Sequence, residues 1–117
     1  MCDNPLQLVV IIRKDLDWPS GPIISQAVHA SVKILEETKD RPETKEYLLK
    51  DNLPLMHTVI LGVKSLTKLK NVKKKLDDGG IPSCIWIETP EMVETALGVA
   101  PSRKSDLAPF LKKLRLF

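Results

Sequence analysis

One polar side chain on a predicted helix could take part in proton transfer. Gln26 and His29 are three residues apart, so they share one face of the helix expected over residues 23–35. Histidine is the side chain that most readily exchanges a proton near neutral pH, which makes His29 a candidate general base. A histidine beside an apolar stripe is also commonly structural, with its ring held by a backbone carbonyl. Both interpretations stay open.

Two carboxylates follow predicted strands. Asp15 comes after the apolar run 8–12, and Glu88 comes after the run 83–87. In open sheets built from alternating strands and helices, sites gather at the carboxyl ends of the strands. We therefore expect Asp15 and Glu88 to face one crevice and to act in catalysis with His29. The alternative is that both are solvated loop carboxylates.

The turn before the predicted helix could bind an anion. In Ser20-Gly21-Pro22, Pro22 suits the first helical position, which makes Ser20 or Gly21 the expected N-cap. The first N–H groups of a helix have no partner inside it, so those of Gly21, Ile23 and Ile24 could hold a phosphate or an oxyanion. Most helix N-termini, however, bind only water.

Positive charge is concentrated in the second half of the chain. Residues 64–117 carry a net charge of +5, and residues 1–63 a net charge of −2. An uninterrupted set of lysines lies on or beside a helix expected from residue 66: Lys64, Lys68, Lys70, Lys73, Lys74 and Lys75. Lys70, Lys73 and Lys74 are our candidates for contact with RNA phosphates, and a merely solvated face is the alternative.

Four segments are predicted to be strands. They are short apolar runs bounded by charged or turn residues, at 8–12, 56–61, 83–87 and 95–100. The first has no polar alternation, which is typical of a strand covered on both faces. In the third, Trp86 alternates with Ile85 and Ile87 and so faces the other side of the sheet. There it is either core or a stacking surface for a base.

Apolar stripes predict helices between and after these strands. Ser65 and Ser105 are the expected N-caps of the last two helices, Gly79-Gly80 stops the first of these, and a short helix begins near Pro42. This order predicts one α/β domain over residues 1–117. We expect a four-stranded mixed β-sheet with α-helices on both faces.

Composition narrows the class of protein. Of the 117 residues, 43% are hydrophobic and 28% charged, as in an ordinary soluble globule. No apolar run reaches the roughly 18 residues of a membrane span. Cys2 and Cys84 are expected to be reduced thiols, which indicates a cytoplasmic location. The cysteines and histidines show no metal-ligand spacing, so we expect no metal, no cofactor and no membrane partner.

The opening of the chain resembles that of the type II peptidyl-tRNA hydrolases of archaea and eukaryotes. That family begins with an apolar strand, then Arg-x-Asp-Leu, a turn, and a helix starting Ile-Ala-x-Gln-x-x-His-Ala. The matching residues here are Arg13, Asp15, Leu16, Gly21, Ile23, Gln26, His29 and Ala30.

A eukaryotic branch of the family, called peptidyl-tRNA hydrolase domain-containing protein 1, is similar over nearly the whole chain. It shares a Trp-Pro in the turn, a Trp-x-Glu-x-Pro-Glu after the third strand and a Leu-Lys-Lys-x-Arg-Leu-Phe segment. Here these are Trp18-Pro19, Trp86, Glu88, Pro90, Glu91 and residues 111–117.

The resemblance implies a carboxylic ester hydrolase that acts on N-acyl-aminoacyl-tRNA, with tRNA as its partner, and a four-stranded mixed sheet wrapped by helices. Together with the motif positions, it makes Ser20, Gly21, Gln26 and Thr95 the candidate substrate-binding residues, beside the three lysines named above. A second copy of the chain, in a homodimer, is the other partner considered.

Two features of the family's active enzymes are absent. The turn, residues 17–22, has no lysine, and the Asp-Ala-Gly-x-Thr segment is replaced by a shorter stretch containing Glu88. Glu88 is the nearby replacement for the family's carboxylate, and Arg13 or Lys14 could replace its lysine. The alternative function is therefore a non-catalytic module that binds tRNA, another RNA or a protein and kept the fold.

Overall fold

The computed structural model describes residues 3–117, so the predicted state of Cys2 lies outside it. The strands are β1 (Leu6–Arg13), β2 (His57–Val63), β3 (Ser83–Glu88), β4 (Val93–Arg103) and β5 (Arg115–Leu116). The helices are α1 (Ser20–Glu37), α2 (Pro42–Tyr47), α3 (Leu66–Asp78) and α4 (Lys104–Leu111), with short 3-10 helices η1 (Lys14–Leu16) and η2 (Leu53–Leu55). Among the described residues, no helix combines the length and apolar character needed to span a membrane.

All five strands form one mixed sheet in the order β3-β4-β1-β2-β5. The central strand β1 is parallel to β2 and antiparallel to β4, and β3 and β5 pair antiparallel with β4 and β2. The prediction of four strands was wrong. The segment after α4 turns back along β2, where Arg115 pairs with Gly62 and Leu116 with Leu61. A strand of two residues is too short to show a periodic pattern in the sequence.

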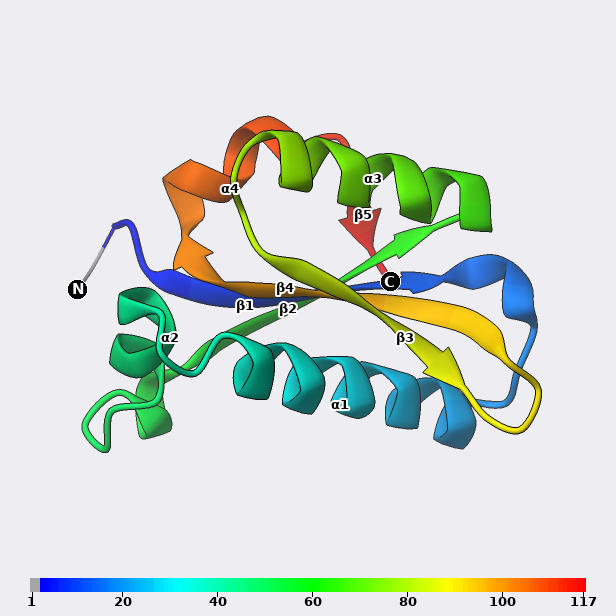
Figure 1. Cartoon of the computed structure of the whole chain (residues 1–117), viewed down its shortest axis with the longest axis horizontal. Coiled ribbons are helices and arrows are strands. Elements are labelled where there is room, and N and C mark those ends of the chain that lie inside the picture. Colours follow the sequence, from blue (N-terminus) through cyan, green and yellow to red (C-terminus); the bar gives the residue numbers. More distant parts are fainter. Residues whose placement is uncertain (1–2) are drawn as a thin grey trace.

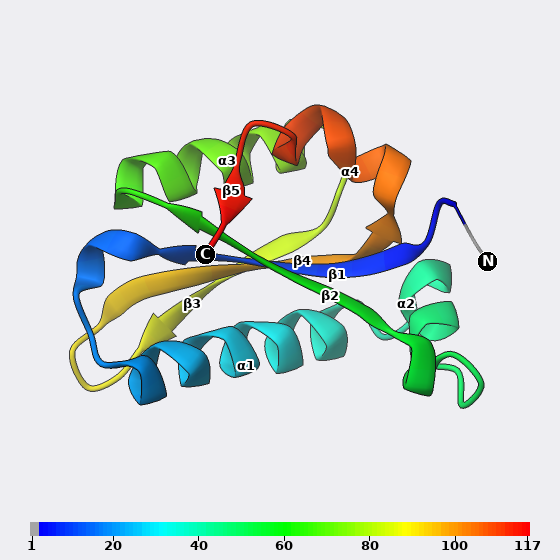
Figure 2. The same ribbon diagram turned by 180° about the vertical axis from the view of Figure 1, so that it is seen from behind.

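Helices cover both faces of the sheet, as predicted. Figure 1 shows α1 and α2 on one face and α3 and α4 on the other, and Figure 2 shows the same layers from behind. The apolar run of β1 serves both layers, because successive side chains of a strand point to opposite faces. Val9 and Ile11 belong to the core beneath α3 and α4, whereas Val10 and Ile12 belong to the core beneath α1.

Strand β4 presents small residues to α1. Ala96, Gly98 and Ala100 alternate with the larger Leu97 and Val99, which pack on the other face. A Cβ atom at Gly98 would lie only 2.5 Å from the backbone oxygen of Ala30, so α1 could not sit at this depth over any other residue. This close approach fixes how far the polar face of α1 reaches over β3 and β4.

Helix caps agree with the sequence in one of three cases. Ser65 caps α3, its Oγ accepting a hydrogen bond from the N–H of Lys68 at 3.1 Å, as predicted. Neither Ser20 nor Gly21 caps α1, because the helix already begins at Ser20 and Pro19 holds the N-cap position. Proline is tolerated at any position of the first turn, whose N–H groups have no helical partner, so it did not locate the helix start.

The predicted cap of α4 was also wrong. This helix begins at Lys104 directly after β4, with Arg103 at the N-cap position. Its first turn is capped from another segment instead, because the N–H of Ser105 donates to Oδ1 of Asn4 at 2.9 Å. A cap supplied across the fold leaves no signal in the local sequence.

The buried position of β1 predicts a large stability loss on truncation. Ile11 is 0% exposed in the core beneath α3 and α4. We expect Ile11→Ala to lower the free energy of unfolding by about 2–5 kcal/mol, measured by urea denaturation. Ile24→Ala is the matched control, since Ile24 on α1 is 62% exposed, and should change stability by under about 0.5 kcal/mol. Equal effects of the two substitutions would contradict the central position of β1.

Candidate active site at the end of β3

The carboxylate of Glu88 is held by two donors at the end of β3. The indole Nε1–H of Trp86 donates to Oε1 at 3.1 Å, and the amide Nε2–H of Gln26 donates to Oε2 at 3.2 Å. Trp86 is two residues before Glu88, so the same strand positions both. Gln26 comes from α1. The sequence prediction that Trp86 faces away from Ile85 is confirmed, since Trp86 packs in the α1 layer and Ile85 in the α3 layer.

A buried hydrogen-bond chain fixes the orientation of Gln26. Its Nε2 also donates to the carbonyl of Pro22 at 3.1 Å, and its Oε1 accepts from Oγ1 of Thr95 at 2.8 Å. Gln26 and Thr95 are only 1% and 0% exposed. Because a backbone carbonyl and a carboxylate oxygen accept from Nε2 while a hydroxyl donates to Oε1, the amide fits this network in one orientation only.

An irregularity in the β3–β4 pairing places Thr95. Trp86 pairs with Ala96, but the next residue Ile87 pairs with Glu94, so Thr95 is left over between them. Such a bulge re-aims the side chain of the extra residue. Here the result is a hydroxyl directed at Gln26 on α1. Sequence reasoning did not predict this bulge, although a polar Gln26 within an apolar helix stripe is a signal of a buried polar partner.

His29 packs against the ring of Trp86. The two ring centroids are 4.8 Å apart with the planes inclined by 32°. His29 is half-buried on α1, one turn after Gln26. Among residues 3–117, no hydrogen bond to a ring nitrogen of His29 is formed, so the ring is held by packing and its nitrogens remain available for a substrate or water. His29 and Glu88 thus both contact Trp86, and their catalytic role stays a prediction.

The surroundings of Glu88 favour its charged form. The pKa of Glu88 is lowered from 4.5, chiefly by the hydrogen bond from Trp86, then by that from Gln26, and further by the charge of His29. Burial acts in the opposite direction but is outweighed. A carboxylate of this kind is a weak base at neutral pH and a strong hydrogen-bond acceptor. It is suited to orienting a water molecule or the imidazole of His29 rather than to removing a proton alone.

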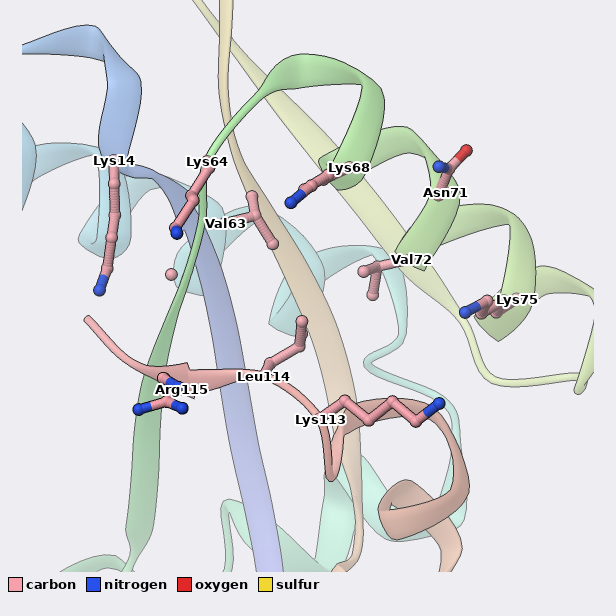
Figure 3. A pocket seen from close by; sticks show the side chains of 11 residues that line it. Lys14, Val63, Lys64, Lys68, Asn71, Val72, Lys75, Lys113, Leu114 and Arg115 are labelled. Carbon is pink, nitrogen blue, oxygen red and sulfur yellow. The ribbon is translucent and has the colours of Figure 1, made fainter.

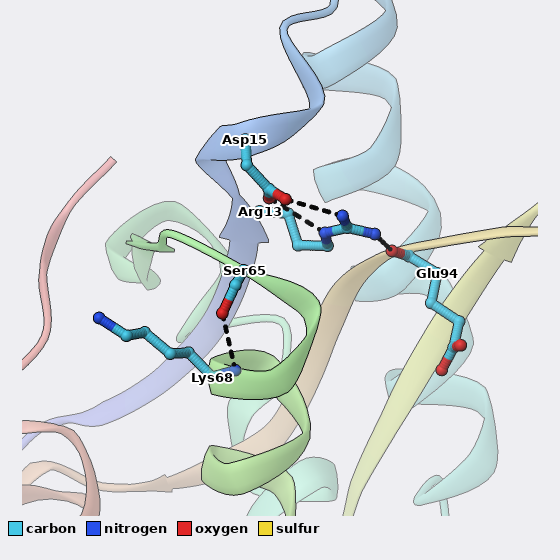
Figure 4. Close-up of polar contacts among 5 residues, drawn as sticks. All are labelled: Arg13, Asp15, Ser65, Lys68 and Glu94. Carbon is cyan, nitrogen blue, oxygen red and sulfur yellow. Dashed lines mark hydrogen bonds and ion pairs between the residues drawn. The ribbon is translucent and has the colours of Figure 1, made fainter.

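Asp15 belongs to a neighbouring cluster at the same edge of the sheet. Figure 4 shows the guanidinium of Arg13 between the carboxylate of Asp15 and the backbone oxygen of Glu94. Arg13 donates to both carboxylate oxygens, at 3.1 and 2.8 Å, and to Glu94 at 3.0 Å. These hydrogen bonds from Arg13 lower the pKa of Asp15. No hydrogen bond or ion pair joins Asp15 to Glu88 within the described chain.

The other residues predicted to act near Glu88 lie in the first turn of α1 or at and directly after the end of β1. Ser20 and Gly21 lie exposed in the first turn of α1, but the N–H of Ile23 is not free, since it donates to the carbonyl of Pro19 at 3.2 Å. Arg13 is engaged as described, and Lys14 points across β2 toward β5, away from β3, where its Nζ lies 3.4 Å from the carbonyl of Leu116. Neither cation therefore contacts Glu88.

The three lysines predicted to contact RNA each have a carboxylate partner. Lys70 lies 3.7 Å from Glu94, while Lys73 and Lys74 lie 3.3 and 3.2 Å from the acids one turn further along α3. Exposed ion pairs of this kind contribute about 0–1 kcal/mol and do not prevent a phosphate from binding. Contact with RNA stays a prediction for this face. Among residues 3–117, no three His, Cys, Asp or Glu side chains are grouped to hold a metal ion.

Comparison with known proteins connects this arrangement to one group. The family described as Peptidyl-tRNA hydrolase PTH2 matches residues 6–117. Human and mouse proteins, each named "Putative peptidyl-tRNA hydrolase PTRHD1", are 34% identical over 113 residues, which is 92% of this chain and 79% of their own length. A Sulfolobus acidocaldarius protein named Peptidyl-tRNA hydrolase is 30% identical over 86 residues, or 68% of this chain and 69% of its own length.

The hydrogen bond from Trp86 predicts a measurable pKa effect. In a carbon-detected NMR titration, wild-type Glu88 should titrate below 4.5, and Trp86→Phe should move its pKa back up, because phenylalanine keeps the ring but not the donor. His29→Ala should have a smaller effect. Since the folded-state pKa is the lower one, the contribution of Glu88 to stability is present above about pH 4.5 and is lost as the pH falls through the lowered value. An unchanged Glu88 pKa in Trp86→Phe would contradict this assignment.

Proposed function

The chain belongs to the Peptidyl-tRNA hydrolase PTH2 family, and from this premise we propose that it hydrolyses the ester between a peptide and the terminal ribose of tRNA. The observation that carries the proposal is the oriented carboxylate of Glu88 beside His29. Ester hydrolysis needs an activated water, donors for the developing oxyanion and a cationic surface for the RNA.

In the proposed reaction, His29 and Glu88 act on one water molecule. Glu88 stays charged because Trp86 and Gln26 donate to it. It orients the water and stabilises the positive charge that His29 acquires on taking the water's proton. The water oxygen bonds to the ester carbonyl carbon, and the bond from that carbon to the ribose oxygen breaks. The ribose oxygen takes the proton that His29 received, which restores the neutral imidazole and gives a tRNA with a free terminal hydroxyl, and the new carboxylic acid ionises by releasing the second proton of the water to solvent.

The other predicted residues support this centre. The exposed turn of Ser20 and Gly21 offers backbone N–H donors to the oxyanion or to a terminal phosphate. Gln26 and Thr95 act from beneath, since they are buried and fix the direction in which Glu88 faces. Asp15 pairs with Arg13 beside the site. Its proposed part in catalysis is to hold the guanidinium of Arg13 in place there.

Contacts with tRNA, cellular location and oligomeric state complete the proposed function. Lys70, Lys73 and Lys74 are proposed to contact tRNA phosphates in exchange for their carboxylate partners. Cys84 is a buried free thiol, in keeping with the proposed cytoplasmic location. A homodimer is a further proposal, which sedimentation analysis decides.

The alternative is a module that binds tRNA, another RNA or a protein without hydrolysis. Its support is the turn at residues 17–22, which has no lysine, and the engagement of Arg13 and Lys14 elsewhere. A catalytic centre built on Glu88 must then operate without a nearby lysine. The two functions differ in turnover and agree in tRNA binding.

Substitution of the two central side chains tests the proposed reaction. We expect Glu88→Gln and His29→Ala each to lower kcat at least tenfold on N-blocked aminoacyl-tRNA, because a positioned acid or base group contributes about 10²–10⁴-fold in rate. Binding of tRNA should stay unchanged. Glu91→Gln and His57→Ala are the matched controls, since both residues are exposed and outside the site. If both test variants keep the wild-type rate, the site is wrongly placed.

A further inference from the structure

A cavity near the end of β2, on the α3 side of the sheet, gathers positive charge. It has a volume of about 330 Å³ and lies between the end of β2, helix α3 and the segment 113–115. Figure 3 shows the side chains that surround it. Six of them are cationic: Lys14, Lys64, Lys68, Lys75, Lys113 and Arg115. Within the described chain, no aspartate or glutamate lines this space.

The charges of this cavity are not neutralised within the protein. Across residues 3–117, none of the six cations forms an ion pair, whereas Lys70, Lys73 and Lys74 on the other side of α3 each do. Like charges gathered around one space repel one another, and the positive end of α3 adds to their field. A bound anion would remove this repulsion.

Local structure brings the cations together from three segments. Lys68 and Lys75 are seven residues apart on α3, so they share one face of the helix with Asn71 between them. Lys14 reaches the cavity by crossing β2 at Gly62, where any Cβ atom would overlap its side chain. The two-residue strand β5 holds Arg115 beside Gly62 on the other side.

The arrangement fits a chain of phosphates better than one small anion. Lys68 and Lys75 are separated by about 10 Å along the helix axis, which exceeds the size of a single phosphate. The ring of Phe117 is exposed beside the cavity, with Nζ of Lys14 at 5.8 Å from its centroid. Cationic grooves flanked by exposed aromatic rings bind nucleic acid strands through phosphate contacts and base stacking.

The position of the cavity relative to Glu88 points to a large substrate. β1, β2 and β3 run in the same direction, so Val63 and Glu88 end at the same edge of the sheet. Three strand spacings separate β2 from β3, or about 14 Å across the sheet. Only a ligand longer than one nucleotide could occupy both places at once.

We infer that this cavity binds the RNA backbone of the substrate at phosphates remote from the ester. The inference rests on the proposed function, because it takes tRNA as the ligand that reaches Glu88. It assigns Lys68 and Lys75 to substrate affinity and gives them no part in the chemical step. The cavity is thus a second point of attachment, separate from the cluster around Glu88.

Binding of dye-labelled deacylated tRNA, followed by fluorescence anisotropy over a series of salt concentrations, tests this inference. The double variant Lys68→Gln/Lys75→Gln should weaken binding at least tenfold. It should also reduce the slope of log affinity against log salt by about 1.4–1.8, the change expected when two phosphate contacts are lost. Lys45→Gln/Lys50→Gln is the matched control, with the same loss of charge at exposed positions outside the cavity, and should weaken binding less than twofold. Unchanged thermal midpoints confirm that the variants are folded.

Three results would overturn the inference. The first is a normal tRNA affinity in the cavity variant, and the second is an equal loss in the cavity and control variants. In the third, pyrophosphate binds the wild type at micromolar concentration, loses that affinity in the cavity variant and does not displace tRNA, which would assign the cavity to a free phosphorylated molecule. Because deacylated tRNA has no ester, the test is independent of hydrolysis. A protein that binds tRNA through the cavity without turnover would refute the proposed function and leave this inference standing.

Discussion

Helix α1 can lie close to the sheet only because β4 presents Ala96, Gly98 and Ala100 to it. At Gly98 even one additional carbon would collide with the backbone of α1. This approach places the amide of Gln26 within hydrogen-bond reach of Glu88 and the ring of His29 against Trp86. A helix held farther from the sheet would leave both side chains in solvent, and Glu88 would lose one of its two donors. The packing of small residues therefore positions the contacts that α1 makes with the candidate site.

The proposed chemistry of the site depends on the hydrogen bonds that the carboxylate of Glu88 accepts. Buried polar groups need partners, and here Thr95 orients Gln26 so that its amide donates to the carboxylate. The resulting charge is fixed in place and lies next to an imidazole with no hydrogen-bond partner in the described chain. Asp15 and Arg13 form a separate, self-satisfied pair at the same edge. The cationic cavity lies beyond β1, near the end of β2, so the proposed RNA contacts and the proposed action on the ester occupy different parts of the same end of the sheet.

Patterns within single elements made the fold largely predictable. The apolar run of β1, the stripe of α3 with Ser65 at its start and Gly79 at its end, and the alternation around Trp86 all reported local geometry correctly. The failures involve contacts between distant segments. Neither the cap from Asn4 nor the short strand β5 leaves a local pattern. Trp18, in the turn before α1, likewise packs against the core beneath α1.

Prediction of the site was limited by the same distinction. Glu88 could be named because it follows a predicted strand, and His29 because it shares a helix face with Gln26. In the structure both contact Trp86. The bulge at Thr95 could not be foreseen, because it depends on the register between two strands. The pairing of Lys70, Lys73 and Lys74 with acids depends likewise on side-chain geometry, and it separates these lysines from those of the cavity.

Single-turnover hydrolysis in water enriched in heavy oxygen tests the central claim most directly. Purified wild-type protein is placed in excess over an N-blocked aminoacyl-tRNA, and the molecular mass of the released N-blocked amino acid is measured by mass spectrometry. The account predicts release well above the rate in buffer, with one heavy oxygen atom in the carboxylate of the acid, because water attacks the ester carbonyl beside Glu88 and His29. Release no faster than in buffer, with tRNA binding intact, would contradict it and identify the protein as a binding module.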